Sequence, residues 1–207
     1  IQRKHQKLLE EAPSSALDEE LRDRMGTLAV KIARAVGYYS AGTVEFLLDS
    51  DQNFYFMEMN TRIQVEHPVT EMITGIDLIE QQIRIAMGEE LSIRQEDVRL
   101  NGWAIECRIN AEDVQAGFAP SPGRIEKISF PEGDGIRVDT GVSAGSAIVA
   151  AYDSMIAKLI VTGTDRRSAI TNTKLALDKV WIKGTKTTLP FFRMLMRNNL
   201  FQSGNFT

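Results

Sequence analysis

Apolar side chains recur every three or four positions along the first predicted helix. They form one stripe, made of Leu17, Leu21, Met25, Leu28, Ile32 and Val36. This period is typical of a helix that packs one face on a core. Ser15 is expected to cap its start, and Gly37 is expected to end it.

Two strand-like runs follow, at residues 42–48 and 53–60. Asp49-Ser50-Asp51-Gln52 lies between them, and residues of these types favour a tight turn. We therefore expect a β-hairpin. A second helix is predicted over residues 77–87 and should end at Gly88. The side chains expected to face inward from it are Leu78, Ile79, Ile83 and Met87.

From residue 103 the pattern changes to short strands punctuated by glycine and proline. The predicted strands are 103–110, 123–130, 135–139 and 154–161. Asp165 is expected to cap a helix, and a last helix should begin near Thr188-Leu189-Pro190, because proline suits a first helical turn. Residues 88–99 are polar and linker-like, so we divide the chain into domains 1–98 and 99–207.

The composition is that of an ordinary globular protein. Hydrophobic residues make up 43% and charged residues 25% of the 207 positions, so a stable core is possible. The formal net charge is −4 and no basic block occurs, so nucleic acid is not an expected partner. No apolar run is long enough to predict a membrane span. The single cysteine, Cys107, cannot form an internal disulfide, which favours an intracellular setting.

Folding the hairpin symmetrically about Asp51-Gln52 brings two acidic residues together. Residue i then faces residue 103 minus i, so Glu45 lies opposite Glu58. Strand alternation decides which other side chains share their face. The expected set is Thr43, Leu47, Phe54, Phe56 and Asn60.

Two carboxylates that face each other repel, most strongly where apolar side chains exclude water. A divalent cation held by Glu45, Glu58 and the side-chain carbonyl of Asn60 would offset this repulsion. Such hard oxygen ligands suit Mg²⁺, which takes its remaining ligands from water and substrate phosphates. The alternative is a solvent-facing hairpin edge with two harmless glutamates, and the spacing leaves both interpretations open.

Polar and apolar residues continue to alternate beyond the hairpin. If the strand period persists, Arg62, Gln64 and Glu66 continue the face of the acidic pair. An arginine can bind a small planar anion through two hydrogen bonds, and a carboxylate away from the metal could act as a general base. The alternative is an ordinary charged loop, which explains each residue singly but not the regular alternation.

Several ordered motifs span essentially the whole chain. They are Glu58-Met59-Asn60-Thr61-Arg62-Ile63-Gln64-Val65-Glu66-His67-Pro68-Val69-Thr70-Glu71, Arg3-Lys4-His5-Gln6-Lys7 with Glu11-Ala12-Pro13, Glu106-Cys107-Arg108-Ile109-Asn110-Ala111-Glu112, Pro120-Ser121-Pro122-Gly123 and Tyr152-Asp153-Ser154-Met155-Ile156-Ala157-Lys158-Leu159. Together they resemble biotin carboxylase, the ATP-grasp component of biotin-dependent acetyl-CoA, propionyl-CoA and pyruvate carboxylases. The resemblance implies an α+β fold. Residues 1–98 would form the C-terminal lobe of an ATP-grasp domain, and residues 99–207 a biotin carboxylase C-terminal α+β domain.

The resemblance also implies roles at matching positions. The metal ligands would be Glu45, Glu58 and Asn60. The bicarbonate site would comprise Lys7, Arg62, Gln64 and the Val65 backbone. Glu66 resembles the base that deprotonates bicarbonate, and Arg137 the arginine that stabilises the biotin enolate. The ATP contacts would be Gln2, His5, Leu47, Glu45 and Glu58. Without the resemblance, His5 and Arg137 would be interpreted as ordinary surface residues.

The activity implied is that of a ligase that carboxylates biotin with bicarbonate, using ATP and Mg²⁺ or Mn²⁺. Biotin would arrive on a carboxyl carrier protein or domain, and a carboxyltransferase would use the product. A homodimer, a cytoplasmic location (or a mitochondrial or plastid matrix) and no membrane partner are expected. Two alternatives stay open at this stage. One is another ATP-grasp ligase, such as a carbamoyl-phosphate or purine-pathway enzyme, and the other is a non-enzymatic, dimer-forming fragment.

The chain departs from the family pattern in two respects. In some members the two metal glutamates are one position closer together, and we expect the extra residue at the hairpin tip, within residues 50–53. The family's N-terminal nucleotide-fold domain and its glycine-rich ATP lid have no counterpart in these residues. We therefore expect the chain by itself to be inactive.

Overall fold

The computed structural model describes residues 1–205. The chain divides into two compact units, the first made of Ile1–Ala12 with the chain from Asn101 onward, and the second of Pro13–Leu100. Both combine helices with small antiparallel sheets, which confirms the predicted α+β class. The assignment of residues 1–98 and 99–207 to two family domains stays a prediction. Within residues 1–205, no helix has both the length and the apolar character that a membrane crossing requires.

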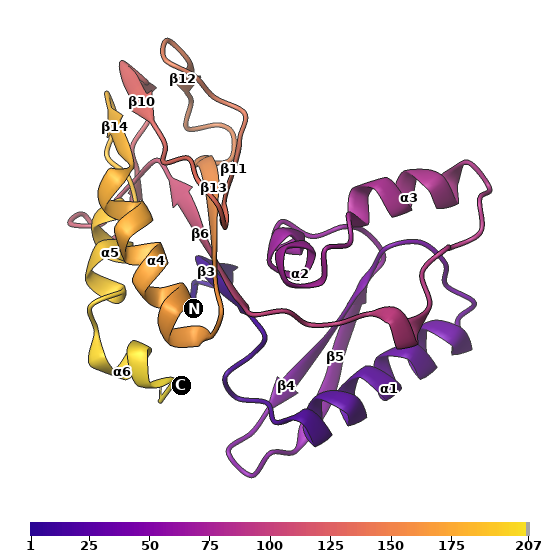
Figure 1. Cartoon of the computed structure of the whole chain (residues 1–207). Helices are drawn as coiled ribbons and strands as arrows, with labels where there is room; N and C mark the ends of the chain where they lie inside the picture. Colours follow the sequence, from indigo (N-terminus) through magenta and orange to yellow (C-terminus); the bar gives the residue numbers. More distant parts are fainter. Residues whose placement is uncertain (206–207) are drawn as a thin grey trace. The chain divides into compact units, whose positions relative to one another are not determined.

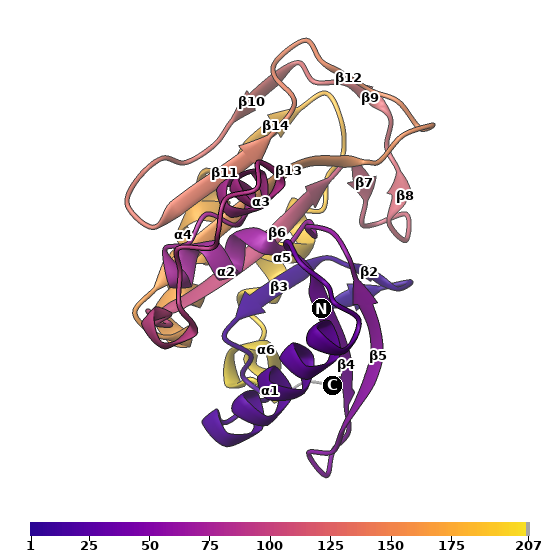
Figure 2. The same ribbon diagram turned by 90° about the vertical axis from the view of Figure 1, so that its right-hand side faces the viewer.

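The second unit consists of a long β-hairpin, a helix that runs beside it, and two shorter helices (Figures 1 and 2). Its elements are α1 (Glu19–Ala35), β4 (Thr43–Leu48), β5 (Phe54–Asn60), α2 (His67–Thr74), α3 (Leu78–Ala86) and the 3-10 turn η1 (Gln95–Asp97). The predicted helix, hairpin and second helix are confirmed. The short helix α2 was not predicted.

Helix α1 begins later than the sequence suggested. Asp18, not Ser15, is the N-cap, and its side chain accepts a hydrogen bond of 2.8 Å from the backbone N–H of Leu21. Glu19 and Glu20 occupy the first turn, where the helix dipole favours negative charge. The prediction of Ser15 as the cap was wrong because Ser15 lies in a separate turn before the helix.

The hairpin register is the one predicted, but only near the acidic pair. Glu45 pairs with Glu58, whereas beyond this point the register shifts by one and Phe46 pairs with Phe56. The residue left over is Met57, which forms a bulge inside β5. The expected position of the extra residue at the hairpin tip stays a prediction. A bulge reverses the alternation of side chains beyond it.

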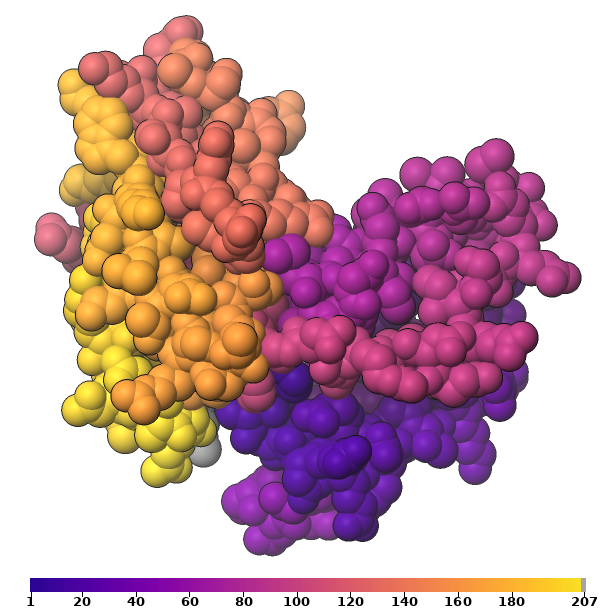
Figure 3. Space-filling model, in the orientation of Figure 1, coloured from indigo at the N-terminus to yellow at the C-terminus, as the bar shows by residue number. Residues whose placement is uncertain are grey.

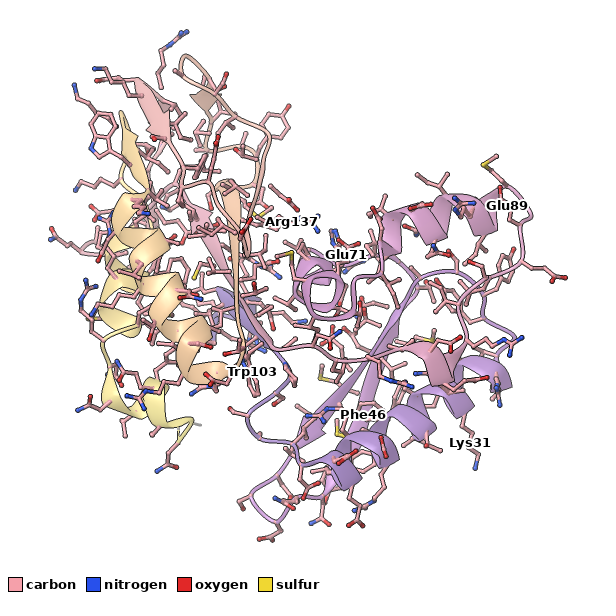
Figure 4. The ribbon with its side chains drawn as sticks, viewed as in Figure 1. Lys31, Phe46, Glu71, Glu89, Trp103 and Arg137 are labelled. Atoms are coloured by element: carbon pink, nitrogen blue, oxygen red, sulfur yellow. The ribbon has the colours of Figure 1, made fainter. Side chains whose placement is uncertain are left out.

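The bulge moves two phenylalanines off the face of the acidic pair. Phe54 and Phe56 instead join Phe46, with ring centroids 5.5 and 6.3 Å from that of Phe46. Figure 4 shows Phe46 on the side of the hairpin that α1 covers, and the Arg24 guanidinium lies 5.5 Å from the Phe54 centroid. The expectation that Phe54 and Phe56 would surround the carboxylates was therefore wrong.

Helix α3 begins at the N-cap Asp77, whose carboxylate accepts from the N–H of Glu80 at 2.8 Å. None of its residues is buried, and the side chains of Ile83 and Met87 are 57% and 72% exposed. The prediction of an inward apolar stripe on this helix is therefore wrong within this chain.

The first unit holds the main core. Its helices are α4 (Arg166–Lys179), α5 (Leu189–Leu195) and α6 (Asn199–Ser203). Its strands are β1 (Gln2–Arg3), β2 (Gln6–Lys7), β3 (Leu9–Ala12), β6 (Trp103–Asn110), β7 (Glu112–Asp113), β8 (Ala119–Pro120), β9 (Gly123–Arg124), β10 (Lys127–Ser129), β11 (Ile136–Thr140), β12 (Ala147–Ile148), β13 (Met155–Gly163) and β14 (Trp181–Lys183). The starts of two helices confirm two predictions. Asp165 and Ser168 form a capping box on α4, and Pro190 lies in the first turn of α5.

A four-stranded antiparallel sheet organises this unit, in the order β11-β13-β6-β3. Helix α4 packs on one face, and its outer side, coloured orange, lies at the surface in Figure 3. The covered face carries core residues that alternate along the strands, among them Ile105, Cys107, Ile109, Leu159 and Val161. The opposite face carries charge, because Glu106, Arg108 and Lys158 occupy the intervening positions.

Replacing Asp18 with alanine should lower the free energy of unfolding by about 1 kcal/mol, because the N–H of Leu21 loses its acceptor. Ser15→Ala is the matched control and should change the same quantity by less than about 0.5 kcal/mol. Urea unfolding followed by circular dichroism measures both. Equal losses in the two variants would contradict the assignment of the cap.

Candidate active site

The acidic pair of the hairpin is joined by a single side-chain amide. Asn60 Nδ2 donates to Glu45 Oε1 at 3.0 Å and to Glu58 Oε1 at 3.1 Å. Glu45 is half-buried and Glu58 is exposed. The two carboxylates therefore converge on one point, as the sequence predicted, and an N–H₂ group at that point offsets part of their repulsion.

The direction of the Asn60 amide follows from the charges around it. Its nitrogen faces two carboxylate oxygens, and its oxygen accepts a hydrogen bond of 3.3 Å from Arg62 Nη2. A half-turn of the amide would set oxygen against carboxylate and N–H against guanidinium. In the absence of a cation, this orientation is the one that satisfies all three neighbours.

Arg62 and Gln64 join the acidic pair by a route different from the one predicted. Strand β5 ends at Asn60, so the strand period does not continue and that expectation was wrong. The chain turns instead, and Gln64 Nε2 returns to donate to Glu45 Oε1 at 2.8 Å. Arg62 also donates to the carbonyl of Ile63 at 3.2 Å. The predicted neighbours are therefore brought together by a turn.

The end of this turn places the predicted base. Glu66 is the N-cap residue of α2, but its side chain makes no capping hydrogen bond. Val65 and Glu66 are both half-buried. The carboxylate of Glu66 is thus not committed to closing the helix, and its assigned role as base stays a prediction.

The donor set fits a hard divalent cation. Two carboxylate oxygens lie within 3.1 Å of one point, and oxygen ligands of this kind suit Mg²⁺. The described residues contain no cluster of three or more His, Cys, Asp or Glu side chains that could hold a metal. A cation here would therefore take further ligands from water or phosphate. Asn60 could contribute its carbonyl oxygen only after a half-turn of the amide.

Three further predicted residues lie on a small hairpin of the first unit. Gln2 pairs with Lys7 across β1 and β2, and His5 is exposed in the connecting turn. Lys4 and His5 both adopt positive φ, of 49° and 63°, which matches a tight two-residue hairpin turn. Leu47, in the second unit, shares the face of Glu45 and is 59% exposed. A single ATP or bicarbonate site that unites the two units stays a prediction.

Arg137, labelled in Figure 4, lies on β11 in the first unit. Its Nε and Nη2 donate to the two oxygens of Asp139 at 2.8 and 3.1 Å. Lys158 Nζ lies 3.1 Å from Asp139 Oδ2. This two-point contact fixes the plane of the guanidinium, which remains 32% exposed.

Two family models match the chain. The model of the carbamoyl-phosphate synthase L chain, ATP binding domain, matches residues 1–94, and that of the biotin carboxylase C-terminal domain matches residues 106–207. Curated relatives match along the whole chain. Biotin carboxylase 1 of Bacillus subtilis is 58% identical over 207 residues, which cover 100% of this chain and 46% of the relative. The biotin carboxylase of a Nostoc species is 57% identical over 205 residues, covering 99% of this chain and 46% of the relative.

A solved structure gives the same result. It is the crystal structure of the biotin carboxylase domain dimer of the Hydrogenobacter thermophilus 2-oxoglutarate carboxylase, in complex with MgADP, ADP and bicarbonate. Its TM-score is 0.98 at 55% identity, covering 100% of this chain and 46% of that one. The chain belongs to the biotin carboxylase family. It matches the C-terminal half of these proteins and spans less than half the length of the curated relatives named above.

Family membership sets aside the alternative of a carbamoyl-phosphate or purine-pathway ligase. It also draws attention to side chains for which the sequence predicted no role. In the biotin carboxylase motif, His67 contacts Gln64 and Glu71 lies beside His67. In the first unit, Asp139 binds Arg137 and Lys158 lies beside Asp139. The sequence signals that could have revealed these contacts are spacings. His67 and Glu71 are four positions apart on a helix, and Arg137 and Asp139 are two positions apart on a strand.

Mg²⁺ should raise the melting temperature of the chain by roughly 2–4 °C, which is about 1 kcal/mol at this size. Glu58→Gln should raise the melting temperature in metal-free buffer, because one of two repelling charges is removed, and should weaken the response to Mg²⁺. Glu132→Gln, an exposed glutamate of the first unit, is the charge-matched control. An unchanged Mg²⁺ response in Glu58→Gln would exclude this pair as the cation site.

The pKa of Asp139 predicts a pH-dependent contribution to stability. Burial acts to raise this pKa, but hydrogen bonds from Arg137 and Lys158 outweigh it, so the pKa lies below its usual value. The stabilisation is therefore present above the unfolded-state pKa of about 3.9 and is lost as pH falls through the folded-state pKa.

Asp139→Asn should consequently destabilise the chain at neutral pH, and the difference from wild type should shrink below about pH 4. Urea unfolding over a pH series measures it. Asp134→Asn, at an exposed aspartate, serves as the control. A difference that stays constant down to about pH 2 would contradict the ionic contribution of Asp139.

Proposed function

We propose that this chain forms the C-terminal part of a biotin carboxylase, which carboxylates carrier-bound biotin with bicarbonate at the expense of ATP. The observation that supports this most strongly is the hydrogen-bonded group of Glu45, Glu58, Asn60, Arg62 and Gln64 in one unit. It combines a cation-binding acidic pair with groups that bind an anion. The Hydrogenobacter relative, described with MgADP and bicarbonate, contains both classes of ligand.

The anion site has the polarity that bicarbonate requires. Bicarbonate is a planar anion with one O–H donor. The exposed guanidinium of Arg62 can donate to its oxygens. Gln64 Oε1 is buried without a hydrogen-bond partner, which is costly for an acceptor, and it would accept from the O–H when bicarbonate first binds, before Glu66 takes the proton. Lys7 and the backbone N–H of Val65 are the further donors that we assign.

In the first step, Glu66 removes the proton of bicarbonate, so that an anionic oxygen can attack the γ-phosphorus of ATP. One O–P bond forms and the bond to ADP breaks, which gives carboxyphosphate and ADP. Mg²⁺, or Mn²⁺, held through Glu45, Glu58 and Asn60 would neutralise charge on the phosphoryl group. Arg62 keeps the nucleophile in place.

In the second step, carboxyphosphate divides into carbon dioxide and phosphate. The phosphate takes the proton from N1 of biotin, and the nitrogen then attacks carbon dioxide. Negative charge develops on the ureido oxygen of biotin, and Arg137 is the cation that we assign to it. The rigid hold of Asp139 on Arg137 supports this role, since a preorganised donor loses little energy on reorganisation.

The proposal includes the partners that this chemistry needs. A biotin carboxyl carrier protein or domain would present the substrate, and a carboxyltransferase would consume carboxybiotin. Assembly as a homodimer is also proposed, in line with the dimer named for the Hydrogenobacter relative. Gln2, His5 and Leu47 are the additional contacts that we assign to ATP.

The chain by itself should show little or no biotin-dependent ATP cleavage. A chimaera in which residues 1–207 replace the matching segment of Bacillus subtilis biotin carboxylase 1 should be active, because the relative supplies the remainder of the protein. Release of phosphate from ATP, with and without biotin and bicarbonate, measures both. Full activity of the 207-residue chain alone would refute the first expectation, and an inactive but folded chimaera would oppose the second.

In the same chimaera, Glu66→Gln and Arg62→Ala should each reduce carboxylation by roughly 10²–10⁴-fold, because a general base or an anion clamp is removed. Thermal unfolding should be unchanged. Arg94→Ala removes an exposed arginine outside the site and is the control for Arg62→Ala. Rates near those of the parent chimaera in both site variants would remove the assignment of the bicarbonate site.

A further inference from the structure

The imidazole of His67 lies between the predicted anion site and a buried carboxylate. Its Nδ1 is 2.8 Å from the carbonyl oxygen of Gln64, and its Nε2 is 3.8 Å from Glu71 Oε2. The side chains of His67 and Glu71 are only 13% and 8% exposed. Both belong to α2, where their i,i+4 spacing places them on one side of the helix.

The partner of Nδ1 decides where the proton of the ring lies. A carbonyl oxygen can only accept a hydrogen bond, so a nitrogen at 2.8 Å from it must carry hydrogen. His67 is therefore protonated on Nδ1. Nε2 then faces Glu71 either as a bare nitrogen or, in the imidazolium form, as a second N–H donor. The usual neutral tautomer, with hydrogen on Nε2 alone, would set two lone pairs against each other at Gln64.

Glu71 is itself anchored to the next helix. Its Oε1 accepts a hydrogen bond of 2.7 Å from the N–H of Leu78, the first residue of α3. This N–H belongs to the orphan donors of a helix start, so the bond stabilises α3 and holds the carboxylate in place. Figure 4 labels Glu71 on α2, beside the segment that leads into α3.

The contacts form a continuous line that ends at the acidic pair. The backbone N–H of His67 also donates to the Gln64 carbonyl, at 3.3 Å, so this oxygen accepts from both the main chain and the ring. The side chain of the same Gln64 reaches Glu45 at 2.8 Å. Leu78, Glu71, His67, Gln64 and Glu45 are thus linked in order.

We propose that His67, protonated on Nδ1 and held by Glu71, is a positioning residue. It fixes the main chain of Gln64, so that the side-chain amide of Gln64 bridges Glu45 and the anion. The role in anion binding rests on the proposed function. The position of the ring proton of His67 and the fixed orientation of the Gln64 side chain do not. His67 does not touch bicarbonate. It acts through Gln64, whose buried Oε1 must be aimed correctly to accept from a ligand.

The first test reads the proton position directly. The chain has two histidines, so long-range ¹H–¹⁵N spectra of the imidazoles contain two ring systems, and His5→Gln identifies the signals of His67. We expect hydrogen on Nδ1 at every pH at which the chain is folded. A neutral ring with hydrogen on Nε2 and a bare Nδ1 would overturn the proposal.

The second test separates positioning from simple support of the helix. His67→Asn keeps an N–H donor near the place of Nδ1, whereas His67→Leu removes the donor but keeps the bulk. The ordered side-chain amide signals of Gln64 should persist in His67→Asn and collapse to those of a freely rotating amide in His67→Leu. Ordered Gln64 signals in a folded His67→Leu variant would overturn the proposal. Loss of order in both variants would show that His67 only supports the helix, and would also overturn the positioning role.

A titration with bicarbonate in the presence of Mg²⁺ then tests the link to the proposed function. The Gln64 signals of wild type and His67→Asn should shift over the same range of bicarbonate concentration. His67→Leu should require at least tenfold more. If wild type fails to respond although its tautomer and Gln64 order are as expected, the proposed function fails in this chain and the positioning role stands. Equal responses of wild type and His67→Leu would refute the role of His67 in anion binding.

Discussion

The opposition of Glu45 and Glu58 across the hairpin is the constraint on which the candidate site depends. Two acidic groups held face to face by backbone pairing need positive or N–H partners. The structure supplies them through the amides of Asn60 and Gln64. Arg62 then faces the oxygen of Asn60, since that end of the amide is the one left available to a donor. The polarity of the site thus follows from one strand pairing.

The turn after β5 brings further polar side chains to the acidic pair. Because the strand stops at Asn60, Gln64 can return to Glu45, nineteen positions earlier in the chain. Helix α2 begins directly afterwards. Its His67 contacts the carbonyl oxygen of Gln64 in the turn, and Glu71 lies beside His67. A chain that continued as a strand would have carried these polar groups away from the acidic pair. The end of the strand therefore matters as much as its register.

The first unit also places charged side chains next to one another, on one face of its four-stranded sheet. One face of its sheet is apolar and packs on α4, while the other carries charged side chains, among them Glu106, Arg108 and Lys158. Arg137, Asp139 and Lys158 form the outer part of this arrangement. Flanking one carboxylate with two cations gives Arg137 a fixed direction while leaving it accessible. Such fixed donors are what a reaction that develops negative charge requires.

The sequence by itself determined the α+β class, the hairpin, the opposition of Glu45 and Glu58, the cap at Asp165 and the helix start at Pro190, because these depend on local periods and turn chemistry. The tertiary structure alone decided the bulge at Met57, which moved the phenylalanines away from the carboxylates, and the return of Gln64 to Glu45. A single unpaired residue reverses strand alternation, and no local pattern reveals it. The partners of His67 and Arg137 were likewise decided by packing, since a charge selects its neighbours only after the chain has folded.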